Sequence, residues 1–165
     1  LWSKSQMDGP TVQLKQIDLI SALAKTLEME RTLALDKNIS LSYHIPSPIL
    51  VIADIDMLQL VVRNLISNAI KFTPFGGNIK LTVALIGKQC KLSVIDNGSG
   101  ISEDKKTEIF SMKATPAYGT DNEKGVGLGL LLCKEFIERQ GGSIGFESKV
   151  NVGSTFFILI PLHLN

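Results

Sequence analysis

Hydrophobic residues recur at helical spacing in several stretches of the chain. The first predicted helix begins at Asp18. Its expected buried side consists of leucines: Leu19, Leu23, Leu27, Leu33 and Leu35. A second helix begins after Asp54 or Asp56, since either carboxylate can cap it, and runs to about Phe72. A proline and two glycines over 74–77 then end this helix.

Two more helices are predicted in the second half of the chain. A short helix over 103–110 follows Ser102, which suits an N-cap. A longer helix over about 128–140 ends at 141–142, two glycines that suit a C-cap. The residues between these helices, 111–126, have no dependable period, and we expect them to form a mobile loop.

Alternating or β-rich runs separate the helices. Leu41, Tyr43 and Ile45 alternate with polar residues, which indicates a half-buried strand. Strands are predicted over 39–45, 50–52, 78–86, 90–96, 143–148 and 154–161. Because the strands and helices do not follow a strict βαβ order, we predict a two-layer α/β sandwich, with helices packed on one face of a mixed, mainly antiparallel sheet.

Composition narrows the possible functions. The 165 residues are 44% hydrophobic, which suits one compact domain with a core. The 17 basic and 16 acidic residues give a net charge of +1, and no basic stripe appears, so no nucleic-acid partner is expected. The longest apolar runs, such as 156–160, are too short to span a membrane.

The cysteines and histidines do not predict a metal site. Cys90 and Cys133 are far apart in apolar surroundings, so we expect buried free thiols. His44 and His163 have no cysteine or acidic partner at the spacing of zinc ligands, so we expect structural or surface residues.

Polar residues at helical spacing mark one edge of the second long helix. Asn64, Asn68 and Lys71 share one narrow face beside an apolar stripe, which is where a cleft can form. The stripe consists of Leu58, Val61, Leu65, Ala69 and Phe72. Amide oxygens suit Mg²⁺, and a lysine suits a phosphate oxygen. A simple solvated helix edge is an equally open interpretation.

Two glycine-rich segments accompany that helix. Asp96 precedes Gly98 and Gly100 at the end of a predicted strand, where a carboxylate can accept a hydrogen bond from an amine such as that of adenine. A tight turn is the alternative, since Asp, Asn and Gly are common turn residues. The glycines of 125–130 open the last long helix, whose free N–H groups attract phosphate, although they could instead serve helix packing. Lys124, Lys113 and Tyr118 could close over a bound triphosphate, and Lys124 is the candidate we retain, because it adjoins these glycines.

In this order, the motifs resemble the ATP-binding catalytic domain of sensor histidine kinases, within the Bergerat-fold ATPase superfamily. The resemblance covers about residues 17–162 and involves four motifs. They are Asn64-x-x-x-Asn68-Ala69-x-Lys71-Phe72-Thr73, Asp96-x-Gly98-x-Gly100-Ile101, Gly125-x-Gly127-Leu128-Gly129-Leu130 and Gly153-Ser154-Thr155-Phe156.

The resemblance implies a role for each motif. Asn64 and Asn68 would hold Mg²⁺, Asn64 and Lys71 would be catalytic, Asp96 would bind the adenine amine, and Thr155 would assist through water. The glycines of the second motif would let the base approach. The expected nucleotide-binding residues are Asn64, Asn68, Lys71, Phe72, Asp96, Gly98, Gly100, Ile101, Lys124, Gly125, Gly127, Leu128, Gly129, Leu130 and Thr155.

One position distinguishes branches of the superfamily. ATP-hydrolysing relatives, and also anti-sigma serine kinases, have a glutamate where this chain has Asn64. The asparagine side chain, unlike the glutamate, cannot act as a general base at neutral pH. This favours phosphoryl transfer over hydrolysis. Two motifs depart from the family pattern: Ile109-Phe110 is followed by 112–115 without the usual second phenylalanine and arginine, and Val126 replaces a common threonine.

The resemblance also implies a larger parent protein. Residues 1–9 are expected to be a remnant of the preceding dimerisation and phosphoacceptor helices, and 10–165 the kinase domain. It would transfer the γ-phosphoryl group of ATP to a histidine on those helices, for relay to a response regulator. We expect a monomeric, cytoplasmic domain, whether or not the parent is membrane-anchored. The alternatives are a degenerate module that signals by contact and an anti-sigma-type serine kinase.

Overall fold

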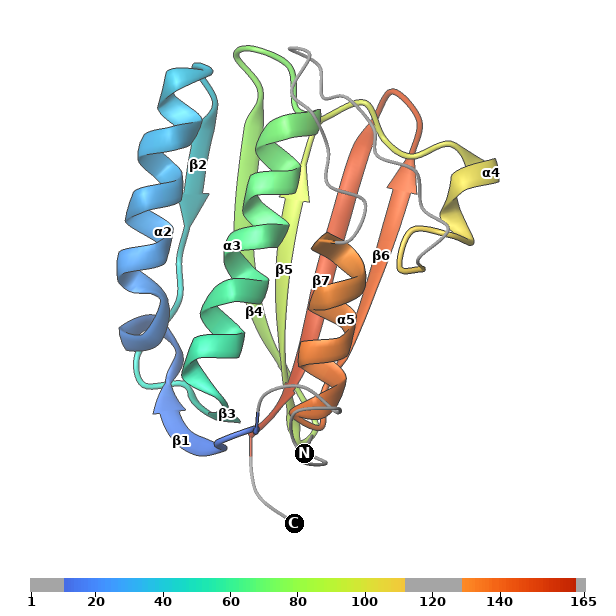
Figure 1. Ribbon diagram of the computed structural model, residues 1–165. Coiled ribbons are helices and arrows are strands. Elements are labelled where there is room, and N and C mark those ends of the chain that lie inside the picture. The colour runs from blue at the N-terminus through green and yellow to red at the C-terminus, as the bar shows by residue number, and fades with distance from the viewer. Residues whose placement is uncertain (1–10, 112–128, 163–165) are drawn as a thin grey trace, which may run out of the picture.

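The computed structural model describes residues 11–111 and 129–162 as a sheet covered by helices (Figure 1). The helices are α2 (Leu19–Asp36), α3 (Ile55–Phe72), α4 (Glu103–Lys106) and α5 (Gly129–Arg139). The strands are β1 (Lys15–Asp18), β2 (Ser40–Tyr43), β3 (Leu50–Ala53), β4 (Asn78–Ile86), β5 (Gln89–Asp96), β6 (Ser143–Lys149) and β7 (Gly153–Pro161). Helices α2, α3 and α5 lie on one face of the main sheet, which confirms the predicted two-layer sandwich.

The main sheet is mixed and mainly antiparallel, as predicted. Its strand order is β2-β4-β5-β7-β6. Only the β2–β4 pair at one edge is parallel, and the other neighbours are antiparallel. The β4–β5 turn has a positive φ of 58° at Gly87, a conformation that glycine adopts without steric cost.

Strand β1 was not predicted from the sequence. It forms a separate two-stranded sheet with β3, in antiparallel register from Lys15 opposite Ala53 to Asp18 opposite Leu50. The Asp18 carboxylate accepts a hydrogen bond of 3.0 Å from the Ile49 backbone N–H beside this pair. Because the partner strand is far away in sequence and no tight turn joins the two, local patterning gives no signal for β1.

The core lies between the main sheet and the three helices. The predicted apolar stripe of α3 is buried from Leu58 to Ala69, and its last member, Phe72, is half-buried. On α2, the prediction is correct for the first three leucines and wrong for Leu33 and Leu35, which are 53% and 63% exposed. Glu30 and Ala34 are buried there instead, because the buried face of α2 continues at helical spacing from Leu27.

Both ends of α3 are held by side chains. Asp54, one of the two predicted candidates, is the N-cap, and its carboxylate accepts a 3.1 Å hydrogen bond from Met57 N–H. At the other end, the buried Lys37 ammonium donates to the carbonyls of Ile70 and Lys71, at 3.0 and 3.1 Å. A cation suits the C-terminal end of a helix dipole. These contacts fix the helix that carries the predicted metal ligands.

Helix α4 is shorter than the predicted helix over 103–110, since it ends at Lys106. Ser102 occupies its N-cap position, but its side chain makes no capping hydrogen bond. The predicted helical remnant over 1–9 lies outside the described residues, as does the expected loop apart from Ser111. Within the described part of the chain, no helix has both the length and the apolar content needed to cross a bilayer.

Candidate nucleotide-binding site

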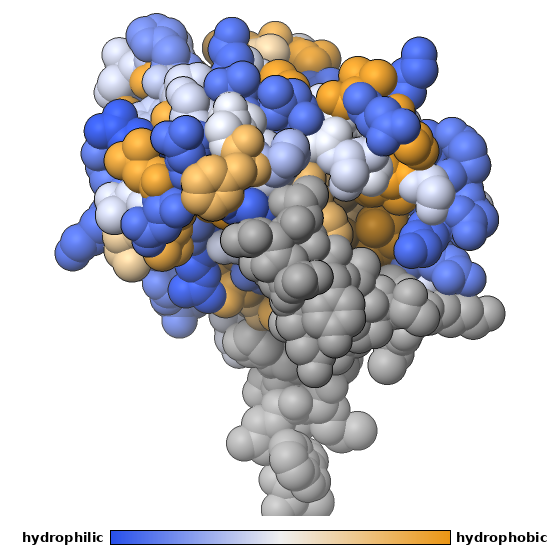
Figure 2. Space-filling view, turned by 90° about the horizontal axis from the view of Figure 1, so that it is seen from above, coloured by the Kyte–Doolittle hydropathy of each residue, from blue (hydrophilic) through white to orange (hydrophobic). Residues whose placement is uncertain are grey.

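Three segments meet at the upper end of the sheet in Figure 1, and the first two carry candidate residues. They are the C-terminal end of α3, the glycine segment 97–101 after β5, and the β6–β7 turn over 150–152. The Ser99 backbone N–H donates to the Phe72 carbonyl at 3.2 Å, and Asn151 N–H donates to the Ser99 carbonyl at 2.8 Å. Figure 2 looks down on this end, where hydrophobic and hydrophilic side chains are interspersed.

Asp96 is the last residue of β5 and is 9% exposed. Its Oδ1 accepts hydrogen bonds from the backbone N–H groups of Gly98, at 2.9 Å, and Ser154, at 3.2 Å. Burial raises the pKa of the Asp96 carboxyl, and these two hydrogen bonds oppose the rise. No hydrogen bond from a described residue reaches Oδ2. The carboxylate is therefore fixed through one oxygen and can accept a ligand donor through the other.

The glycines of this segment are required by contacts within the protein itself. A Cβ added to Gly98 would lie 2.3 Å from the Phe72 carbonyl oxygen. Gly100 has a φ of +75°, and a Cβ there would lie 2.3 Å from the Lys149 carbonyl oxygen. We predicted that both glycines let a base approach. The structure gives each a packing role, and the approach of a base remains a prediction.

The strand register places Ser154 opposite Asp96, while the role of Thr155 through water stays a prediction. In β5 and β7, Asp96 pairs with Ser154, and Ile95 pairs with Thr155. Because successive side chains of a strand point to opposite faces, Ser154 shares the helix-covered face with Asp96, and Thr155 belongs to the open face. The sequence carried this signal, since alternation back from the apolar residues Phe156 and Ile158 already places Ser154 inward.

The polar row of α3 borders the buried stripe, as predicted. Asn64, Asn68 and Lys71 are all half-buried. The Lys71 ammonium lies 5.1 Å from the centre of the Phe72 ring, a cation–π contact at the end of the helix. The row is therefore a partly exposed edge between α3 and its surroundings, where amide oxygens can reach a ligand.

Helix α5 packs beside this row through Cys133. The buried thiol lies 3.8 Å from the Val61 carbonyl oxygen. Burial raises the pKa of the Cys133 thiol to about 11, and a hydrogen bond with the Asn64 side chain opposes the rise. Burial likewise raises the pKa of Cys90 to about 11. Both thiols are free and buried, which confirms the prediction for the cysteines.

Ile101 and Phe110 join the candidate site to the core. Both are half-buried and pack against core residues. The Phe110 ring makes edge-on contacts with the rings of Phe146 and Phe156, with centroid distances of 5.6 and 6.3 Å. The partial match to the family's phenylalanine motif therefore has a packing role at Phe110, while its altered positions over 112–115 lie outside the described residues.

Several predicted nucleotide-binding residues lie outside the described residues. These are Lys124, Gly125, Gly127 and Leu128, together with the loop candidates Lys113 and Tyr118. Gly129 and Leu130 are described, and they form the first turn of α5 with half-buried positions. The described residues bring no group of three His, Cys, Asp or Glu side chains close enough to hold a metal ion, so the proposed metal ligands there are the amides of Asn64 and Asn68.

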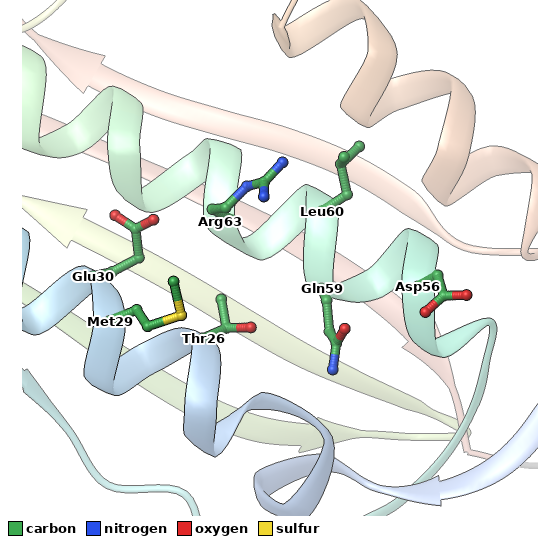
Figure 3. Close-up of a pocket in the computed structure, with 7 residues that line it drawn as sticks. All are labelled: Thr26, Met29, Glu30, Asp56, Gln59, Leu60 and Arg63. Atoms are coloured by element: carbon green, nitrogen blue, oxygen red, sulfur yellow. The ribbon is translucent and has the colours of Figure 1, made fainter.

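A separate cavity of about 200 Å³ lies between α2 and α3 (Figure 3). It is lined by Thr26, Met29, Glu30, Asp56, Gln59, Leu60 and Arg63. Burial raises the pKa of the Glu30 carboxyl, while a hydrogen bond from Ser67 and the charge of Arg63 oppose the rise. None of the lining residues belongs to the predicted nucleotide site, so this cavity does not contribute to it.

Comparison with known proteins identifies the family of this chain and several relatives. Residues 53–164 match the family described as "Histidine kinase-, DNA gyrase B-, and HSP90-like ATPase". Sensor protein EvgS of Escherichia coli O157:H7 is 32% identical over 160 residues, which are 93% of this chain and 13% of EvgS. The adaptive-response sensory kinase SasA of Prochlorococcus marinus (strain MIT 9313) is 34% identical over 151 residues, 90% of this chain and 40% of SasA. The chain thus spans less than half the length of these curated relatives.

Solved structures of similar proteins share the fold. The catalytic domain of histidine kinase ThkA superposes with a TM-score of 0.79 at 29% identity, over 90% of this chain and 95% of that domain. Full-length ShkA in complex with AMPPNP has a TM-score of 0.74 at 27% identity, over 92% of this chain and 31% of ShkA. ThkA in complex with response regulator protein TrrA has a TM-score of 0.75 at 27% identity, over 92% and 42% of the two chains.

Proposed function

The chain belongs to the family of histidine kinase-, DNA gyrase B- and HSP90-like ATPases, and we propose that it is the ATP-binding catalytic domain of a sensor histidine kinase. In this proposal, the domain binds Mg-ATP at the upper end of the sheet. The γ-phosphoryl group passes to a histidine on dimerisation helices of the parent protein, and then to a response regulator. The domain would act in the cytoplasm.

The observation that carries this proposal is the state of Asp96. The carboxylate is buried, two backbone N–H groups fix its Oδ1, and no described residue donates to its Oδ2. Oδ2 is not an enclosed atom, so it can be reached by a hydrogen-bond donor from a ligand, and the exocyclic amine of adenine is one. The half-satisfied acid therefore fits the base of an adenine nucleotide.

The residues of α3 fit the other end of the nucleotide. The half-buried amides of Asn64 and Asn68 lie one helical turn apart, and amide oxygens suit Mg²⁺. Bound Mg²⁺ would supply charge neutralisation for phosphoryl transfer. Lys71 lies near the C-terminal end of the same helix, where its ammonium can orient a phosphate oxygen. Because Lys37 and Asp54 hold the two ends of α3, these groups are pre-positioned.

Asn64 supports transfer to a protein histidine over hydrolysis, because a carboxamide cannot remove a proton from water at neutral pH. The solved complex of ThkA with TrrA supports a response regulator as the downstream partner. A degenerate module that signals by contact is the second candidate, and the altered residues over 112–115 favour it. An anti-sigma serine kinase is disfavoured by Asn64.

Calorimetric titration with ATP, in Mg²⁺ and in excess chelator, separates the first two candidates. We expect wild-type protein to bind ATP more tightly with Mg²⁺. In Asn68→Ala, we expect this enhancement to be lost while the domain stays folded, because one amide ligand is missing. Asp56→Ala, a substitution at an exposed position in the first turn of the same helix, is the matched control. A wild-type protein that fails to bind ATP in either condition would support the degenerate module.

A further inference from the structure

The Ser148 hydroxyl joins three segments around Asp96. Ser148 lies on β6, and its Oγ accepts a 2.8 Å hydrogen bond from the Ile101 backbone N–H. The same oxygen lies 3.2 Å from the Gly153 carbonyl oxygen and 2.7 Å from Ser154 Oγ. Ser148 was not among the residues predicted from the sequence. It makes these contacts within the glycine motif and β7, the two segments that form the surroundings of Asp96.

The number of protons on Ser148 determines how these contacts are shared. A hydroxyl has one proton to donate and two lone pairs to accept with. The Gly153 carbonyl can only accept, so it takes the Ser148 proton at 3.2 Å. Ser148 Oγ then accepts from Ile101 N–H and from the Ser154 hydroxyl. This arrangement gives Ile101, Gly153 and Ser154 each a hydrogen bond with Ser148 Oγ. If Ser148 donated to Ser154 instead, the Gly153 carbonyl would lose this donor.

This direction of hydrogen bonding decides what Ser154 can offer to a ligand. With its proton committed to Ser148, Ser154 Oγ presents only lone pairs elsewhere. Oδ2 of Asp96, the register partner of Ser154, can also only accept. The two side chains thus form a pair of acceptors. The 6-amino group of adenine can donate to such a pair, whereas guanine in the same orientation would place its 6-carbonyl oxygen, an acceptor, against it.

We propose that Ser148 is a positioning residue for the nucleobase: by orienting the Ser154 proton and holding Ile101, it favours adenine over guanine nucleotides. The proposal rests on the proposed function, since it concerns the same binding site. It goes beyond that function in assigning the base preference to a hydroxyl outside the four sequence motifs. Ser148 acts through Ser154 and the glycine segment, without needing to touch the base.

The test compares ATP and GTP binding by calorimetry in wild-type protein, Ser148→Ala, Ser148→Thr and a control. In Ser148→Ala, the Ser154 hydroxyl loses its acceptor, so its proton is free to turn toward the ligand, where it can donate to a carbonyl and is no longer oriented as an acceptor for an amine. We expect ATP affinity to fall about three- to tenfold, the effect of one altered hydrogen bond. GTP affinity should stay equal or rise, so the ATP preference narrows. Ser148→Thr keeps the hydroxyl and should restore the wild-type preference.

A second readout needs no nucleotide. Amide hydrogen exchange at Ile101 should quicken in Ser148→Ala, because the acceptor of its N–H is gone, and should return toward the wild-type rate in Ser148→Thr. Ser143→Ala, on an exposed position of the same strand, should change neither exchange nor base preference. Equal losses of ATP and GTP affinity in Ser148→Ala would overturn the proposal. Wild-type protein that binds neither nucleotide would instead reject the proposed function.

Discussion

Asp96→Asn is a conservative change that isolates the oxygen expected to bind the base. The asparagine side chain has almost the same shape, and its carbonyl oxygen can still accept from Gly98 and Ser154, as Oδ1 does at 2.9 and 3.2 Å. Only Oδ2 is replaced, and the new amide group donates where the carboxylate accepts. An adenine amine would then face another donor.

The magnitude follows from the type of hydrogen bond that is lost. A hydrogen bond to a charged group contributes about 1.5–3 kcal/mol, which corresponds to a loss of ATP affinity of about 10- to 150-fold. Calorimetric titration of ATP measures this loss directly. Asp56→Asn makes the same charge change at an exposed position in the first turn of α3, and it should leave ATP affinity unchanged.

Although Asp96→Asn should weaken ATP binding, we do not expect it to lower the stability of the domain. Because the folded pKa of Asp96 is raised, its contribution to stability is fully present below the ordinary pKa of 3.8 and is lost as pH rises through the folded value. Asparagine does not titrate, so the variant lacks this loss. We expect its free energy of unfolding at pH 7, measured with urea, to be no lower than that of wild type.

Two results would refute this reasoning. If Asp96→Asn bound ATP as tightly as wild type, Oδ2 would not be an acceptor for the base. If the variant lost ATP binding and also lost stability at pH 7, Asp96 would be needed for folding, and the affinity loss would have a structural cause. The combination of weak binding with retained stability is what the geometry of Asp96 requires.

Two further substitutions test how the site is held in place. Gly100→Ala should lower the free energy of unfolding, measured with urea, by about 1–3 kcal/mol, because alanine is strained at a φ of +75° and its Cβ would meet the Lys149 carbonyl. Gly87→Ala, also at positive φ but with open space around it, should lower the free energy of unfolding by less. Equal losses in the two variants would contradict the role of the close contact. Lys37→Met should lower the free energy of unfolding by about 1.5–3 kcal/mol, because the carbonyls of Ile70 and Lys71 lose a charged donor. Lys80→Met, at an exposed position of β4, should have little effect on it. Unchanged stability in Lys37→Met would show that the C-terminal end of α3 is held by other contacts.

The sequence predicted the elements whose patterns are long and self-contained. Helix α3 has a cap at Asp54, a continuous stripe from Leu58 and a terminating turn, and all are present. Strand β1 has none of these signals, because its order comes from pairing with β3. Leu33 and Leu35 matched the leucine pattern of α2, but they fall on its exposed side, and Glu30 is buried in their place.

At the candidate site, the sequence predicted which segments are involved better than it predicted which way their side chains point. The segment that follows Asp96 lies against the C-terminal end of α3, as the combination of motifs led us to expect. Thr155 was chosen from the motif, and only the register with β5 shows that Ser154 is the residue beside Asp96. Ser148 could not be found from local patterning, because its importance depends on contacts with Ile101 and Ser154 that form only when β6, β7 and the glycine segment are assembled.

A crystal structure of this domain with Mg²⁺ and a nonhydrolysable ATP analogue tests the central claim most directly. We predict that the base amine donates to Asp96 Oδ2 and that the amide oxygens of Asn64 and Asn68 are directed toward the ion. A nucleotide seated in the separate cavity between α2 and α3, or a base that makes no contact with Asp96, would contradict the account.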